Sequence, residues 1–510
     1  MLLTRCILSP VLRISASCRI YLYYRTNGHL HIKIFNADEI FINLIFAHRV
    51  IYNKVTRKTG GRRQSRKTKN EREPKARDMR SNLKWEDYLM SQTTITLLFL
   101  AFAIISFILE KIPLGLTATI VALGLNLTGV LDVSQTFAGY INSNVILCVG
   151  MFVVGQALFE TGMANKIGGV VTKFAKSERM LIIAIMIIVG VMSGFLSNTG
   201  TAAVLIPVVC GIADESGYSR SRLLMPLVFA AALGGNLSII GAPGNLMGVN
   251  ALQEMGEPTS FFMYAPVGVP MLVAGIIYMA FIGYRFLPDT RGAQLDSVEE
   301  SKNFDNVPKW KQYVSLAILI ICILAMIFED QIGIKLQVTA CIAACILVLT
   351  GVVTEKEALK SIDLKVVLLF GGSLALATAL DSTGAGALIA DTIVGFLGTN
   401  PNPMILLLVI FIVGCALTNF MSNTATTALM VPIASSLAAS LGADPRSMII
   451  ATVIACSCAY ATPIGMPANT MVVGLGGFKF KDYVIAGLPL ILISFVICMV
   501  LLPILFPFYP

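Results

Sequence analysis

Charged residues are scarce in this chain of 510 residues, and their scarcity argues against an ordinary soluble protein. Only 13% of the residues are Asp, Glu, Lys or Arg, against roughly 25% in soluble domains. Apolar runs at 94–109, 181–196, 313–328 and 484–506 approach the roughly 20 residues that a helix needs to cross hydrocarbon. A buried helix of a soluble protein explains one such run but not a whole series. The sequence therefore predicts an all-α polytopic membrane protein.

Side chains for catalysis and metal binding are also few. The three histidines, His29, His31 and His48, all precede the first long apolar run. The chain carries no H-E-x-x-H motif, paired carboxylates or Ser–His set of the kind that an intramembrane enzyme requires. Its eleven cysteines show no paired spacing, which argues against a disulfide framework or a metal cluster. We therefore expect a protein that is not an enzyme.

Residues 1–89 differ in composition from the rest of the chain. They hold 19 of the 38 Lys and Arg, and no stretch among them is long and apolar enough to span a membrane. By charge alone, such a segment suits a nucleic acid or an anionic lipid surface. We interpret it as a basic N-terminal extension that is non-native or disordered, with the working start at Met90 and no nucleic-acid partner.

The remaining chain consists of two similar halves, 90–287 and 313–510, joined by a polar linker at 288–312 that is predicted to be cytoplasmic. Two motifs occur in the same order in both halves: Ser197-Asn198-Thr199 with Ser422-Asn423-Thr424, and Gly241, Pro243 and Asn245 with Gly465, Pro467 and Asn469. Such spacing indicates an internal repeat. If each Ser-Asn-Thr unit is a re-entrant hairpin, each half has five transmembrane helices plus that hairpin, and the two repeats are inverted.

The distribution of basic residues tests this topology, because cytoplasmic loops collect Lys and Arg. With the Met90 end placed outside, only Lys335 and Arg446 of the 19 Lys and Arg after Met90 fall in outer loops. Counting either Ser-Asn-Thr unit as a full span would reverse the later loops and remove this bias. The charge pattern therefore favours two re-entrant hairpins.

The four breaks predict a binding site near the middle of the membrane. A helix interrupted at membrane depth exposes backbone N–H and C=O groups, which is tolerated only in protein or beside a cavity. The N-terminus of each new half-helix attracts anions, and the free carbonyls attract cations. Ser and Thr that only join neighbouring helices would explain one such motif, but not two motifs that each occur twice.

With these motifs the sequence resembles the divalent anion:sodium symporter family of the ion transporter superfamily, over about 93–507. The resemblance implies a homodimer with elevator-type alternating access and broken helices at the site. It assigns substrate binding to both turns and both prolines: Ser197, Asn198, Thr199, Ser422, Asn423, Thr424, Pro243 and Pro467. It assigns one Na⁺ site to Ser193, Ser197, Asn198 and the carbonyl of Gly241, and the other to Thr418, Asn423 and the carbonyl of Gly465.

We therefore expect a sodium-coupled symporter of small anions, multi-pass in the cell membrane (the inner membrane of a bacterium), with Na⁺ as coupling ion and no cofactor. Ala242 and Met466 precede the turn prolines where many family members carry Thr, which leaves dicarboxylates, citrate, sulfate and other oxyanions open. The alternative is a Na⁺/H⁺ antiporter or metalloid-oxyanion carrier of the same superfamily. A proton relay usually needs ionisable groups inside the bundle, whereas neutral oxygens can hold Na⁺.

Overall fold

The computed structural model describes residues 19–26, 29–36, 91–109, 111–169, 177–291, 304, 306–397 and 402–509. In the N-terminal extension, β1 (Arg19–Thr26) and β2 (His29–Asn36) pair as an antiparallel hairpin, which the sequence did not predict. The rest of the extension lies outside the described residues, so its interpretation as non-native or disordered stays a prediction. From Ser91 onward the described residues form helices and no strand, which confirms the predicted all-α membrane fold.

The described part of the first half contains ten α-helices. They are α2 (Gln92–Leu109), α3 (Leu114–Leu127), α4 (Val133–Ala138), α5 (Ser143–Glu160), α6 (Met163–Gly169), α7 (Glu178–Ser193), α8 (Asn198–Ser216), α9 (Arg220–Gly234), α10 (Pro243–Glu254) and α11 (Ala265–Phe281). Short 3₁₀ turns follow α4, α9 and α11: η2 (Gly139–Ile141), η4 (Gly235–Leu237) and η5 (Gly283–Phe286).

The second half repeats this order of helices. They are α12 (Lys309–Ile327), α13 (Glu329–Ile332), α14 (Leu336–Leu349), α15 (Glu355–Ser361), α16 (Leu364–Ser382), α17 (Ala385–Leu397), α18 (Pro403–Thr418), α19 (Asn423–Leu441), α20 (Pro445–Ser457), α21 (Pro467–Gly476) and α22 (Phe480–Leu505). Only α13 lacks a counterpart among the described helices of the first half. The predicted breaks lie between α7 and α8, α9 and α10, α18 and α19, and α20 and α21.

The short helices α4 and α15 occupy equivalent places in the two halves and were not predicted. Each begins with a capping box, formed by Asp132 with Gln135 and by Thr354 with Glu357. In a capping box, two side chains satisfy backbone N–H groups that the first turn of a helix leaves unpaired. The two helices are too short to cross a membrane, so a search for long apolar runs does not detect them.

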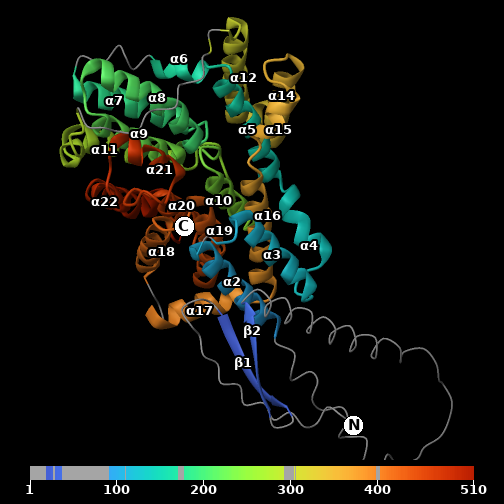
Figure 1. Cartoon of the computed structure of the whole chain (residues 1–510). Helices are drawn as coiled ribbons and strands as arrows, with labels where there is room; N and C mark the ends of the chain where they lie inside the picture. Colours follow the sequence, from blue (N-terminus) through green and yellow to red (C-terminus); the bar gives the residue numbers. More distant parts are fainter. Residues whose placement is uncertain are drawn as a thin grey trace, which may run out of the picture.

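The helices pack into two bundles that lie side by side in Figure 1. We call the first the scaffold bundle; it contains α2 to α5, α12 and α14 to α16. We call the second the hairpin bundle; it contains α7 to α11 and α18 to α22, and α6 and α17 link the two. Contacts within each bundle are extensive, whereas the bundles meet mainly where α5 approaches α10 and where α16 packs on α19.

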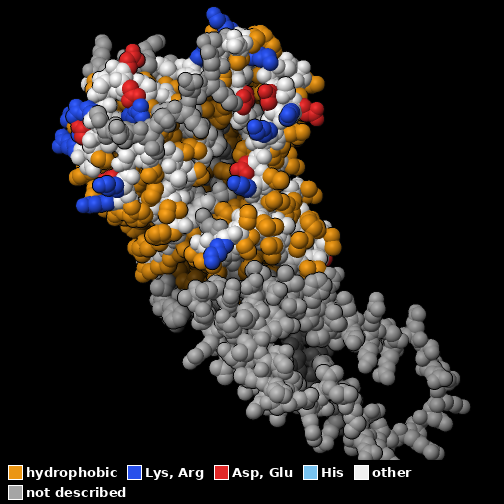
Figure 2. Space-filling model, viewed as in Figure 1, with side chains coloured by type: hydrophobic (Ala, Val, Ile, Leu, Met, Phe, Trp, Pro, Cys, Tyr) orange, Lys and Arg blue, Asp and Glu red, His pale blue; other side chains and the backbone are white. Residues whose placement is uncertain are grey.

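The surface of the described part is that of a membrane protein. Seven helical segments are long and apolar enough to cross a membrane, and large hydrophobic side chains such as Leu349 and Ile504 are exposed. Figure 2 shows a belt of hydrophobic side chains, with most of the Lys and Arg gathered toward the end of the molecule that carries α6 and α12. This distribution agrees with the predicted cytoplasmic side.

Ion pairs join loops that were assigned to the same side of the membrane. On the predicted inner side, Arg222 lies 3.3 Å from Glu178 and 3.7 Å from Asp289. The neighbouring Arg291 lowers the pKa of Asp289 to about 2 by hydrogen bonding, so this carboxylate stays charged at physiological pH. On the predicted outer side, Arg446 lies 3.4 Å from Glu257.

Candidate functional site

Each Ser-Asn-Thr turn starts a half-helix by capping it. The Ser197 hydroxyl accepts a hydrogen bond from the backbone N–H of Gly200 (3.4 Å), and the Ser422 hydroxyl accepts one from that of Ala425 (3.3 Å). Serine is among the best N-cap residues because its side-chain oxygen satisfies a backbone donor that the helix leaves unpaired. The caps therefore hold the N-termini of α8 and α19 open toward the break.

Three oxygens surround the Asn198 amide in the first half. With its nitrogen turned toward them, the amide donates to the carbonyls of Gly241 (2.9 Å) and Ala231 (3.3 Å) and to the Ser193 hydroxyl (2.7 Å). The Ser193 hydroxyl donates in turn to the Ala231 carbonyl at 2.6 Å, and its side chain is fully buried. We call Ser193, Asn198, Ala231 and Gly241 the first oxygen cluster.

The second half builds the same arrangement from equivalent positions. The Thr418 hydroxyl lies 2.8 Å from Asn423 Oδ1 and donates to the Cys456 carbonyl, which corresponds to that of Ala231. Gly465 lies against Thr418, because a Cβ atom on it would come within 2.5 Å of the Thr418 carbonyl. We call Thr418, Asn423, Cys456 and Gly465 the second oxygen cluster. The structure thus brings Ser193, Asn198 and Gly241 together in the first half, and Thr418, Asn423 and Gly465 in the second. Ser197, the remaining predicted Na⁺ residue, is exposed and caps α8 instead.

The two unwound segments are braced in the same way. Asn245 Nδ2 donates to the carbonyls of Gly235 and Ser238, each at 2.7 Å. Its counterpart in the second half, Asn469 Nδ2, donates to the carbonyls of Ala459 (2.7 Å) and Thr462 (3.0 Å). These bonds satisfy backbone carbonyls that have no helical partner, which a buried break requires. They explain the asparagine of each motif.

A tyrosine supports each brace: Tyr264 directly precedes α11, and Tyr483 lies in the first turn of α22. The Tyr264 hydroxyl donates to the Asn245 carbonyl at 2.8 Å, and the Tyr483 hydroxyl donates to the Asn469 carbonyl at 2.7 Å. The two tyrosines are fully buried. They were not predicted from the sequence, although Tyr264 follows Asn245 by 19 residues and Tyr483 follows Asn469 by 14.

The breaks of the two halves meet because α10 packs against α19 and α21 against α8. A Cβ atom on Gly244, at the start of α10, would lie 2.8 Å from the Thr427 hydroxyl, which is one turn beyond Asn423. Only glycine permits this close approach. Since Asn198 also contacts Gly241, the N-termini of α8 and α19 border the same Gly-Ala-Pro-Gly-Asn segment.

Exposure separates the predicted substrate residues from the buried oxygens. Ser197 is exposed and the other five residues of the two turns are half-buried, whereas Ser193 and Thr418 are fully buried. Pro243 is half-buried and Pro467 exposed, each in the first turn of its half-helix. No charged side chain belongs to these turns, so fixed helix dipoles supply the electrostatics of the site.

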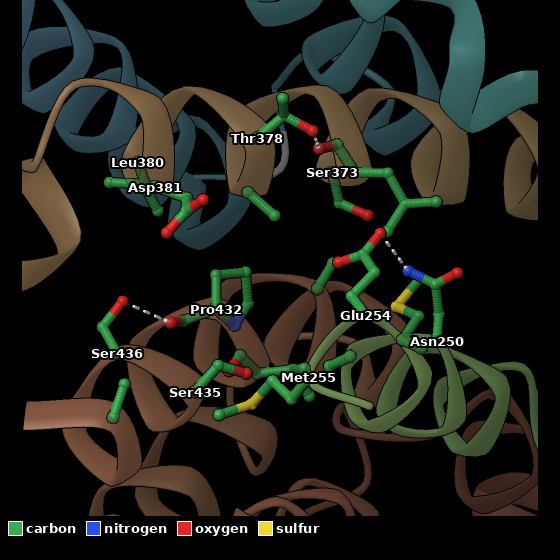
Figure 3. Close-up of a pocket in the computed structure, with 17 residues that line it drawn as sticks. Asn250, Glu254, Met255, Ser373, Thr378, Leu380, Asp381, Pro432, Ser435 and Ser436 are labelled. Atoms are coloured by element: carbon green, nitrogen blue, oxygen red, sulfur yellow. Dashed lines mark hydrogen bonds between the residues drawn. The ribbon is translucent and has the colours of Figure 1, made fainter. Parts of the chain in front are cut away.

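A cavity of about 380 Å³ lies on the predicted outer side, between the two bundles. In Figure 3, Asp381 of α16 and Glu254 of α10 point into it from opposite walls, and Ser435 and Ser436 of α19 line its floor. It extends to Ala428, which follows Thr427, and to Met247, which lies three residues beyond Gly244. The cavity was not predicted from the sequence, because α10, α16 and α19 are far apart in the chain.

A family model described as citrate transporter matches residues 104–455 and 323–509. The chain belongs to the citrate transporter family. The sodium-dependent dicarboxylate transporter SdcS of Staphylococcus saprophyticus is 24% identical, over 78% of this chain and 83% of its own length. An uncharacterized transporter of Haemophilus influenzae is 27% identical, over 79% of this chain and 89% of its own length.

Solved structures show that this member of the citrate transporter family has a transporter fold. The Alcanivorax borkumensis YdaH transporter matches with a TM-score of 0.54 at 14% identity, over 80% of this chain and 97% of its own. Neisseria gonorrhoeae MtrF matches with a TM-score of 0.52 at 13% identity, over 83% of this chain and 98% of its own. The resemblance to the divalent anion:sodium symporters is confirmed, and the protein is a multi-pass membrane transporter, not an enzyme.

Among the described residues, no group of three or more His, Cys, Asp or Glu is placed to hold a metal ion. The oxygens that converge here are hydroxyls, amides and carbonyls. These neutral ligands suit a hard monovalent cation better than a transition metal, which prefers imidazole or thiolate ligands.

Proposed function

We propose that the protein is a sodium-coupled symporter that carries a small di- or tricarboxylate, or sulfate, across the membrane. The observation that carries this proposal is the pair of matched oxygen clusters, each directly beside the capped N-terminus of a half-helix. In the first cluster, three oxygens lie within 3.3 Å of one amide atom of Asn198. If the amide turned its oxygen inward, these groups would supply four neutral ligands to one cation.

The anion would bind at the exposed face of the same turns. In this proposal the hydroxyl and amide groups of Ser197, Asn198 and Thr199 donate to one end of the substrate, and those of Ser422, Asn423 and Thr424 to the other. Pro243 and Pro467 fix the first turns of α10 and α21 beside it. The turns carry no basic side chain, so Na⁺ in the clusters would offset the charge of the anion. Each Asn contributes to both sites, which couples them.

A comparison of the two halves supports elevator-type alternating access. Phe159 of α5 and Asp381 of α16 occupy equivalent positions in the repeat, because residues 157–162 (ALFETG) match residues 379–384 (ALDSTG). Phe159 packs against Gly200, in the first turn of α8. Asp381 instead lines the cavity with Ser435, ten residues beyond the position of α19 that corresponds to Gly200. Ten residues of α-helix extend about 15 Å.

This difference places the hairpin bundle off-centre relative to the scaffold bundle. With the predicted topology, it is displaced toward the cytoplasm. In the opposite end position, Asp381 would lie at the tip of α19, and Phe159 would lie farther along α8. A slide of about 15 Å would connect the two positions. We infer that such a slide carries the site from one side of the membrane to the other. Inverted repeats provide the symmetry that makes both end positions accessible.

Uptake of labelled succinate, citrate and sulfate into proteoliposomes tests the proposal. We expect uptake of at least one of them to require an inward Na⁺ gradient and to stop when K⁺ replaces Na⁺. Anion uptake that is independent of Na⁺ would overturn the coupling. Exchange of Na⁺ for H⁺ without anion flux would favour the antiporter alternative.

A further inference from the structure

Side-chain amides join the two bundles at the N-terminal end of α5. Asn142 Nδ2, in the scaffold bundle, donates to Asn250 Oδ1 of α10 at 2.6 Å. Asn144 Nδ2 donates to Gln253 Oε1 at 3.1 Å and lies 3.5 Å from Asn250 Oδ1. These bonds cross directly from one bundle to the other, on the predicted outer side of the membrane.

The neighbours of this network fix the direction of its hydrogen bonds. Asn250 Nδ2 donates to Glu254 Oε1 at 2.9 Å. Asn142 Oδ1 accepts from the backbone N–H of Asn144, so the Asn142 nitrogen faces Asn250, and the Asn250 amide has to turn its oxygen toward it. The two scaffold asparagines are therefore required as donors. Asn144 and Asn250 are 6% and 3% exposed, so a lost partner would leave a buried polar group unpaired, which is costly.

The network belongs to one side of the membrane only. Ala157 and Ala379 align in the repeat, so Asn142 and Asn144 correspond to Leu364 and Val366. Asn250 and Gln253 correspond to Gly474 and Gly477. None of these four residues has an amide side chain, so the inner side cannot form an equivalent network. The sequence thus favours one end position of the hairpin bundle over the other.

We propose that Asn142, Asn144, Asn250 and Gln253 form a latch that positions the hairpin bundle at its cytoplasmic end position. The inference rests on the proposed function, because it requires the bundle to move. A slide of many ångströms would part all the bonds of the latch, since hydrogen bonds extend to only about 3.2 Å. The latch residues are positioning residues: they do not contact the clusters, but they set how often the site faces inward.

The substitution Asn142→Asp tests the latch by removing a donor; it also adds a negative charge, which the control adds within the scaffold bundle. Asn142 also caps α5 by accepting from the backbone N–H of Asn144 at 2.9 Å, and aspartate preserves this cap. It has no N–H to donate to Asn250. The matched control is Asn126→Asp, because Asn126 Nδ2 donates to the Leu131 carbonyl within the scaffold bundle.

A cross-link between Phe159→Cys and Gly200→Cys, made with a short bifunctional methanethiosulfonate reagent, reports the position of the bundle. The edge of the Phe159 ring touches Gly200 in the present position, and the two Cβ atoms lie too far apart for a direct disulfide. The rate of cross-linking in membranes then follows the population of this state. In the Asn142→Asp background we expect this rate to fall roughly fivefold or more, as for the loss of a buried hydrogen bond. The Asn126→Asp control should match the parent.

The outcomes separate the latch from the proposed function. If the cross-link blocks anion uptake and reduction of its two disulfide bonds restores uptake, the bundle moves as proposed. An unchanged rate in Asn142→Asp would then overturn the latch alone. If the cross-linked protein transports as well as the reduced protein, the elevator motion itself is wrong, and the latch fails with it.

Discussion

The two halves of the transporter are most alike where the chain is irregular and least alike where its bundles meet. Ser193 and Thr418 make the same hydrogen bonds in the two clusters, and Asn245 and Asn469 brace equivalent carbonyls. In contrast, Phe159 packs at a hairpin tip, whereas its counterpart Asp381 lines an outer cavity. The comparison indicates that the two halves share the chemistry of the site, while they differ in how they pack where the two bundles meet.

The largest effect should come from removing the central amide of either cluster. We expect Asn198→Ala and Asn423→Ala each to abolish Na⁺-dependent uptake, because each residue is assigned to both the cation and the anion. The control is Asn402→Ala, which removes only the N-cap of α18. All three variants should insert normally, as judged by size-exclusion chromatography. Coupled uptake retained in one of the two site variants would show that the halves are not equivalent.

The buried hydroxyls should affect sodium more than the anion. Ser193→Ala and Thr418→Ala should each weaken the apparent Na⁺ affinity, by roughly 10- to 100-fold for groups that support a metal site. Thr418→Ser keeps the hydroxyl and makes the second cluster resemble the first, so its Na⁺ dependence should stay near that of the parent. The measurement is initial uptake against Na⁺ concentration. A large loss in Thr418→Ser would mean that the methyl group, not the oxygen, matters there.

The contact between Gly244 and Thr427, which joins the two repeats, should be sensitive to side-chain volume. Gly244→Ala would place a methyl group 2.8 Å from the Thr427 hydroxyl, and such overpacking costs about 1–3 kcal/mol. Where α21 packs against α8, the equivalent residues are Ala468 and Ala202, and both are small. We therefore expect Thr427→Ala to rescue Gly244→Ala in thermal unfolding of the detergent-purified protein. If the double variant is as unstable as Gly244→Ala, the two residues do not meet as described.

The smallest effect should come from the tyrosine braces. Tyr264→Phe and Tyr483→Phe each lose one hydrogen bond to the backbone, which is worth about 1 kcal/mol. We expect similar losses of thermal stability in the two variants, because the braces are equivalent. Tyr509→Phe is the control, since Tyr509 is exposed. If the two variants lost markedly different amounts of thermal stability, the two tyrosine braces would not be equivalent, and the similarity of the halves would be restricted to the oxygen clusters.

The breaks could be located from the sequence, because side-chain types that cap helices or permit unwound turns leave a visible pattern. Most of the cluster residues came from the resemblance to the symporter family. Sequence reasoning did not identify the carbonyls of Ala231 and Cys456, since a backbone oxygen has no sequence signature. It also placed the breaks too late: α9 already ends at Gly234, well before Gly241. The capping boxes of α4 and α15 were readable signals that the sequence analysis passed over.

The different packing of the two halves between the bundles could not be predicted from the sequence. It depends on how two groups of helices meet, and the repeat alone does not determine it. The amides of Asn142 and Asn250 are separated by more than 100 residues, so their contact becomes apparent only in the folded protein.

Equilibrium binding of the transported anion to the purified protein, measured at increasing Na⁺ with K⁺ holding the ionic strength constant, tests the central claim most directly. Linkage requires that ions bound beside the anion raise its affinity, and that the anion raises theirs by the same factor. The account predicts an affinity that increases with Na⁺ and is lost in Asn198→Ala. An affinity that is equal in Na⁺ and K⁺ would contradict it.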